Sequence, residues 1–197
     1  MRKKRIKKSR NILTESWKYL KDSKNYLYLV GFLFLFSFAL AFFIYPPDFL
    51  LELINKIVEE LIQKTSGLNL FQLIVFIFFN NLKVSFVGLF LGILLGVIPL
   101  VLTVFNGYVS GFVSSLVIKD SGIIELWRLF PHGIFELPAV FISLGLGIKL
   151  GMCFFSKNPD KEFLQRIKLS FKVFISIVLP LLIIAAIIEG VLIKRIG

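Results

Sequence analysis

Long apolar runs separated by short polar stretches dominate this chain. Residues 26–45 carry no charge, and further apolar runs cover residues 84–105, 139–155 and 173–193. A helix needs about 20 mostly apolar residues to cross a bilayer, so these segments are predicted to be membrane spans. The pattern therefore predicts an all-α, polytopic membrane protein with no soluble domain.

Two shorter apolar segments fit a full crossing less well. Residues 68–79 are short and end at two asparagines, whereas residues 107–130 are apolar only in their first part. We expect Asn106 and Gly107 to break the helix that precedes them. Both segments are therefore predicted to be broken or half-membrane helices, of the kind that line cavities in membrane proteins.

Two segments have one apolar and one charged face. Apolar residues recur at helical spacing through residues 48–64, which predicts an amphipathic, extramembrane helix within residues 46–67. Residues 11–24 show a similar but narrower apolar stripe that includes Trp17. This second pattern indicates either a short helix on the membrane surface or a partly ordered basic tail.

The charge distribution predicts the orientation in the membrane. The formal net charge is +11; residues 1–25 hold ten lysines or arginines, and a second basic block covers residues 156–172. Basic loops face the cytoplasm, so we expect the 1–25 tail and this loop on the cytoplasmic side of the cell membrane. An even number of crossings must separate them. If residues 107–130 cross, residues 26–197 form one membrane domain with about five crossings; the rival is that 68–82 crosses instead.

Other interpretations of the basic tail are less consistent with the sequence. Nucleic acid is not expected as a partner, because the tail runs directly into a membrane span and faces lipid headgroups. A cleaved signal peptide is not expected either, since the apolar stretch exceeds the usual length of about 7–15 residues. The single cysteine, Cys153, excludes an internal disulfide and is expected to be a small core residue.

Polar residues inside apolar segments are costly and therefore mark candidate sites. The candidates for one intramembrane cluster are Asn80, Asn81, Asn106, His132, Glu136 and Glu189. If the region around His132 is helical, His132 and Glu136 lie on one face. With Glu189 they would give three ligands and an open position, the arrangement of a catalytic zinc or similar divalent metal.

A simpler role for these residues stays open. Pro138 disfavours helix at the residue before it, so residues 132–136 could form a turn in which His132 and Glu136 only hydrogen-bond each other. The metalloprotease motif H-E-x-x-H and the hydrolase motif G-x-S-x-G are both absent from the sequence. The sequence therefore leaves enzymatic activity undecided.

Small residues suggest how the helices pack. Gly88, Gly92 and Gly96 recur every fourth residue, a stripe that allows close approach of another helix, for which Gly147 and Gly151 are the expected partners. Residues 80–96 and 135–151 also align without gaps, with 8 of 17 positions identical and Asn81 opposite Glu136. A duplication would bring two polar helix segments to one shared site.

The order of these motifs resembles that of the stage II sporulation protein M family of integral membrane proteins. The resemblance covers residues 70–195 and rests on Phe79-Asn80-Asn81, the Gly88/Gly92/Gly96 stripe, Asn106-Gly107 with Gly111, Pro131-His132-Gly133 to Glu136, and Ala186 to Gly190. The namesake of this family is a membrane anchor of a complex that remodels peptidoglycan during engulfment. The resemblance thus implies the fold and an anchoring role.

Three functional classes follow from these features. The first is a membrane scaffold or anchor that positions membrane or envelope proteins, acting alone or as a homo-oligomer. The second is a metal-dependent intramembrane hydrolase that uses His132, Glu136 and Glu189. The third is a small-solute transporter, indicated by asparagines at breaks in apolar segments. The first class is the preferred prediction.

Overall fold

The computed structural model describes residues 2–44, 46–124 and 130–196, and of these the side chains of 2–11, 121, 130–132 and 196 fall outside the description. The described chain is helical, with the following elements: α1 (Arg2–Lys21), α2 (Lys24–Phe43), α3 (Asp48–Thr65), α4 (Leu70–Phe90), η1 (Leu91–Ile93), α5 (Val97–Ser121), α6 (Phe130–Gly151), η3 (Met152–Phe155), α7 (Pro159–Val173), η4 (Phe174–Val178) and α8 (Leu179–Ile196).

Five helical segments of the described chain are long and apolar enough to cross a membrane. They are Lys24–Phe43, Leu70–Ile93, Val97–Asp120, Gly133–Phe155 and Pro159–Arg195. The predicted all-α, multi-pass membrane fold with about five crossings is therefore confirmed. The amphipathic helix predicted between residues 46 and 67 is present as α3.

The predicted continuous span over residues 84–105 is wrong, because the chain reverses in its middle. Leu95 and Gly96 both have positive φ angles, 53° and 74°, and form the turn between η1 and α5. Pro99 then lies in the first turn of α5, where a backbone N–H has no helical partner and its absence costs little. Pro99 therefore lies at the start of a new helix and not in the middle of a long one.

The two segments predicted to be broken lie largely in complete helices, as far as they are described; residues 125–129 of the second segment lie outside the described chain. Residues 70–79 belong to α4, which continues through Asn80 and Asn81, and Asn106 and Gly107 lie inside α5 without a break. A methyl group added at Gly107 would overlap the backbone of Phe34 in α2. This glycine therefore serves the close packing of two helices and does not end one.

Two prolines also lie inside helices. α6 continues through Pro138, so the turn considered for residues 132–136 is not formed. Pro180 follows the π-helical segment η4, which joins α7 to α8. A proline clashes with the carbonyl four residues before it, here that of Ser176, and the wider π-helical turn relieves this clash.

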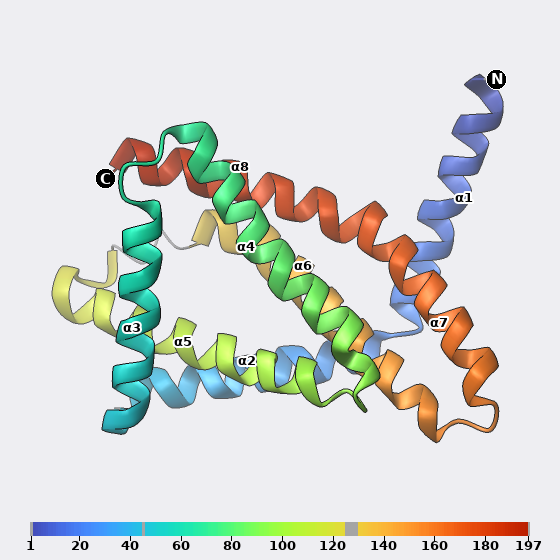
Figure 1. The fold of residues 1–197 in the computed structure, drawn as a ribbon, viewed down its shortest axis with the longest axis horizontal. Coiled ribbons are helices and arrows are strands. Elements are labelled where there is room, and N and C mark those ends of the chain that lie inside the picture. Colours follow the sequence, from blue (N-terminus) through green and yellow to red (C-terminus); the bar gives the residue numbers. More distant parts are fainter. Residues whose placement is uncertain (1, 45, 125–129, 197) are drawn as a thin grey trace.

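The spans pack as two groups (Figure 1). α2 and α5 lie side by side, and α4, α6 and α8 pack against one another. α3 crosses the end of the first group, where its Ile54 packs with Ala41 of α2 and Phe112 of α5. α6, a member of the second group, also contacts α2 and α5 and so connects the two groups.

α1 and α7 meet at the opposite end of the bundle (Figure 1). Lys172 of α7 pairs with Glu15 of α1 at 2.6 Å, and the hydroxyls of Ser16 and Ser176 are 3.0 Å apart. The amino-terminal helix and the second basic block therefore lie at the same end of the molecule. This agrees with the even number of crossings expected between them.

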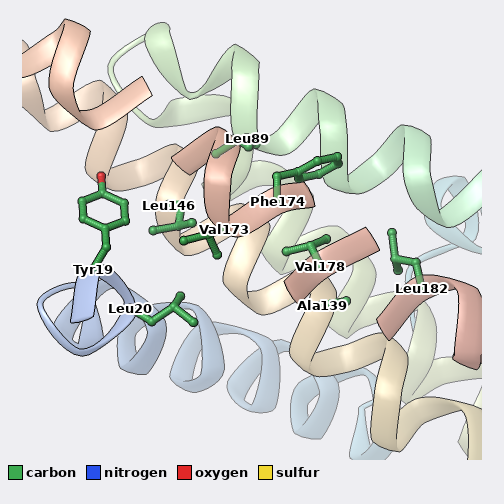
Figure 2. Packing of buried hydrophobic residues seen from close by; sticks show 9 residues of the cluster. All are labelled: Tyr19, Leu20, Leu89, Ala139, Leu146, Val173, Phe174, Val178 and Leu182. Atoms are coloured by element: carbon green, nitrogen blue, oxygen red, sulfur yellow. The ribbon is translucent and has the colours of Figure 1, made fainter. Parts of the chain in front are cut away.

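The largest apolar cluster joins this end to the bundle centre. Figure 2 shows its nine buried residues: Tyr19, Leu20, Leu89, Ala139, Leu146, Val173, Phe174, Val178 and Leu182. They come from α1, α4, α6, α7, η4 and α8, so the three packed spans α4, α6 and α8 share one apolar core with α1 and α7.

Candidate functional site

Three helices bring polar side chains to one place inside the bundle. Asn81 comes from α4, Glu136 from α6 and Glu189 from α8, and these three helices are mutual neighbours. Asn81 is buried, with 8% of its surface exposed, and both glutamates are partly buried. The site thus forms where α4, α6 and α8 meet.

The side chains face one another. The amide of Asn81 lies within hydrogen-bonding reach of the Glu136 carboxyl group. The carboxyl group of Glu189 lies close enough to that of Glu136 for the two to interact electrostatically. A methyl group added at Gly190 would stand 2.5 Å from Ile74 of α4, so this glycine lets α8 approach at the level of Glu189. The three polar groups therefore form one cluster.

Glycine contacts fix the register of α4 against α6. A methyl group added at Gly92 would overlap the backbone of Gly147, and one added at Gly151 would overlap the backbone of Gly92 and Gly96. A methyl group added at Gly88 would overlap the side chain of Leu144 in α6. The predicted stripe thus lies directly against α6, with helix backbones in contact.

The contacting positions are those that align in the internal repeat. Asn81 faces Glu136, Gly92 faces Gly147 and Gly96 faces Gly151, in the same order along both helices. α4 and α6 consequently run parallel, and each is followed by a short 3-10 turn, η1 or η3. Equivalent segments therefore meet at the bundle centre, as in proteins built from parallel repeats.

The remaining candidates lie outside this cluster or cannot be placed in it. Asn80 is exposed on α4. The side-chain amide of Asn106 donates to the backbone carbonyl of Leu102 at 2.7 Å, within its own helix. The backbone of His132 is helical, one turn before Glu136, but its side chain lies outside the described residues.

Oxygen atoms dominate the described part of the cluster. Ser85 follows Asn81 by one turn, is fully buried, and its hydroxyl has no hydrogen-bond partner among the described residues. Within the described part of the chain, no three His, Cys, Asp or Glu side chains form a metal-binding group. The two carboxyl groups and the amide oxygen of the cluster are hard donors, which suit a divalent cation better than a soft metal.

Two lysines inside candidate spans were missed by sequence reasoning. Lys149 of α6 donates to the Ser23 hydroxyl at 2.8 Å, and its ammonium lies 3.9 Å from the centre of the Tyr19 ring. Lys83 of α4 is exposed and has no polar partner among the described residues. Both could have been found by treating every charge within an apolar run as a candidate.

The described helices also form a groove of about 450 Å³ between α3 and α5. Its lining is apolar apart from one tyrosine: Leu50, Ile54, Leu100, Val101, Val104, Phe105 and Tyr108. None of the predicted polar candidates whose side chains are described lines this groove. The polar cluster and the groove are thus separate features of the molecule.

Comparisons with known proteins bear on the motifs that build this cluster. The model of one family, described as stage II sporulation protein M, matches residues 27–192. Comparison with curated proteins and with solved structures finds no match. The matched range contains all five membrane spans except the ends of the first and last, together with Asn81, Glu136 and Glu189. The chain therefore belongs to the stage II sporulation protein M family of membrane proteins.

Proposed function

We propose that this protein is a membrane scaffold or anchor that positions partner proteins at the cell membrane. The observation that carries the proposal is the backbone contact of α4 and its continuation η1 with α6, at Gly92, Gly147 and Gly151. Two helices in such contact leave no room for a solute between them and resist sliding past each other. A rigid bundle is suited to holding other proteins in a fixed position.

Two further features support this proposal. The outer faces of the spans are strongly apolar and exposed, as in Phe32 and Leu35 of α2, each 65% exposed. Such faces accept either lipid or the spans of other proteins. α1 and α7, whose sequences are rich in lysine and arginine, also meet at one end of the bundle, where we expect the cytoplasmic surface. The anchoring role implied by the family resemblance agrees with both features.

Native mass spectrometry in membrane patches extracted without detergent tests this proposal. The tagged full chain should appear with a second protein in a fixed ratio, because a scaffold retains its partners. Complexes of the chain with lipid alone, or with further copies of itself alone, would contradict a role in positioning other proteins.

The paired carboxyl groups support a second candidate function. Glu136 and Glu189, with His132 one turn before Glu136, are the side chains that would hold a divalent metal such as zinc in an intramembrane hydrolase. Such a metal would activate a water molecule for attack on a substrate.

Elemental analysis of purified protein tests this second function. The hydrolase requires about one equivalent of metal, which the substitutions Glu136→Gln and Glu189→Gln should each remove. Asn106→Leu is the matched control, since the amide of Asn106 bonds within its own helix. Equal metal content in wild type and both glutamine variants would contradict this function.

A further inference from the structure

The outer face of α4 carries polar residues in the middle of a membrane span. Asn80 and Lys83 are both exposed, and they lie within the candidate span Leu70–Ile93. They are separated by three positions, so they project from the same side of the helix. Phe79, 59% exposed, and Phe86, 47% exposed, flank them. An amide and an ammonium thus face the lipid between aromatic side chains.

Lipid is a poor environment for these groups. Neither Asn80 nor Lys83 has a polar partner among the described residues, and hydrocarbon offers none. Lys83 lies ten positions before the end of its span at Ile93, which corresponds to about 15 Å of helix. The charge is therefore well inside the apolar segment.

The same fold shows how a partnered span lysine is arranged. Lys149 of α6 has two neighbours, the ring of Tyr19 in α1 and the hydroxyl of Ser23 in the turn between α1 and α2. Lys83 lacks any comparable neighbour within the described chain, although α4 contacts α5, α6 and α8 on its other sides. The contrast indicates that the partner of Lys83 comes from another molecule.

We propose that the outer face of α4, formed by Phe79, Asn80, Lys83 and Phe86, binds the transmembrane helix of a partner protein that carries an aspartate or glutamate within its span. The carboxylate would pair with the Lys83 ammonium, and the Asn80 amide would hydrogen-bond the same helix. This inference rests on the proposed scaffold function and names the chemistry of its partner.

Charge complementarity selects a different protein over a second copy of this chain. The carboxylates inside the apolar parts of its own spans are Glu136 and Glu189, and these face each other between α4, α6 and α8. A second copy packed through α4 would bring another Lys83 against the first. Two ammonium groups at this depth would repel each other, so self-association through this face is disfavoured.

A designed peptide tests this pairing directly. The full-length protein and a fluorescent leucine–alanine transmembrane peptide are reconstituted in phosphatidylcholine vesicles, and binding is followed by energy transfer. A peptide with one central aspartate should bind about tenfold more tightly than the same peptide with leucine, the size expected for a polar contact between helices in lipid. Lys83→Met should remove this preference.

Controls separate the pairing from folding and from general charge effects. Lys64 of α3 is exposed and pairs with Glu60 outside the apolar spans, so Lys64→Met should leave the aspartate preference intact. Lys83→Glu should reverse it, favouring a peptide with a central lysine. Equal binding of the aspartate and leucine peptides to wild type would overturn the proposal and would indicate that Lys83 reaches the headgroups instead. Energy transfer between copies that requires Lys83 would also overturn it.

Retention of a partner protein in native membrane patches tests the scaffold function separately from the α4 pairing. If a partner protein is retained in native membrane patches by wild type and equally by Lys83→Met, the scaffold function stands and the α4 pairing is wrong. If no partner is retained by wild type, the scaffold function fails, whatever the peptide shows.

Discussion

The close contact between η1, the turn that continues α4, and α6 makes a quantitative prediction at Gly92. A Cβ atom added there would stand 2.6 Å from the Cα atom of Gly147 and closer still to its carbonyl group. Carbon atoms normally approach to about 3.5–4.0 Å, so the helices would have to separate by about 1 Å. The obstacle is backbone, which cannot rotate away as a flexible side chain could. Gly92→Ala should therefore destabilise the fold.

The size of this effect follows from two opposing contributions. Forcing one extra carbon into a packed interior typically costs about 1–3 kcal/mol. Replacing a helical glycine by alanine recovers about 0.5–1 kcal/mol, because the unfolded chain loses freedom. We expect a net loss of about 1–2 kcal/mol for Gly92→Ala and a larger one for Gly92→Leu.

Reversible unfolding in mixed micelles, followed by circular dichroism, measures this loss. Gly31→Ala is the matched control: Gly31 lies in the span α2, and the nearest atom to an added Cβ is Cε2 of Phe141 at 4.0 Å. Its substitution should be neutral or slightly stabilising. A Gly92→Ala protein as stable as Gly31→Ala would refute the backbone contact.

Three further predictions concern the end of the bundle where α1 and α7 meet. Cysteines introduced for Lys8 and Gln165, in a chain without Cys153, should both react with a membrane-impermeant thiol reagent only after the cells are opened; labelling of either in intact cells would reject the expected orientation. Lys149→Met should destabilise the fold by about 1–3 kcal/mol, because Ser23 and Tyr19 lose a charged neighbour. Loss of the exposed Lys172–Glu15 pair should cost at most about 1 kcal/mol. Equal losses of stability in denaturant unfolding would contradict this ranking. Burial raises the pKa of Tyr19 above its ordinary value of 10.0, so the unfolded chain releases this proton at a lower pH than the folded chain. The stability of the fold should therefore fall as the pH rises above about 10. Tyr19→Phe should show a shallower fall in stability, and an unchanged fall would argue against a buried phenol.

The sequence predicted the fold class well because a lipid environment leaves few alternatives. Long apolar runs must be helices, since a bilayer satisfies no free backbone polar group. The runs at residues 26–45 and 139–155 and the amphipathic pattern at 48–64 each correspond to a helix of the structure. These elements are determined by composition and spacing alone.

The middle of the chain was harder to predict because polar residues there do not mark helix ends. Asn81 lies inside α4 since Glu136 of another helix faces it, and that partner is invisible in a local pattern. The turn at Leu95 and Gly96 was hidden in an apolar run, although a glycine followed by a proline three residues later is a signal for the end of a helix. Tertiary packing decided both positions.

Part of the candidate site could be predicted from the internal repeat. The alignment of residues 80–96 with 135–151 already placed Asn81 opposite Glu136, and the structure brings those two side chains together. That Glu189 joins them depends on how α8 crosses α4, which its own sequence does not specify. Lys83 was overlooked because attention to buried polar residues gives no weight to an exposed one.

A photo-crosslink on α4 shows whether this membrane bundle holds partner proteins. A benzophenone amino acid replaces Phe79, which is exposed beside Asn80 and Lys83, and native membranes are irradiated. We expect a protein adduct whose crosslinked peptide is a transmembrane segment with an internal aspartate or glutamate, and we expect Lys83→Met to lose this adduct. Adducts with lipid alone, at this position and at Phe32 and Ile183 on the other outer faces, would contradict a scaffold.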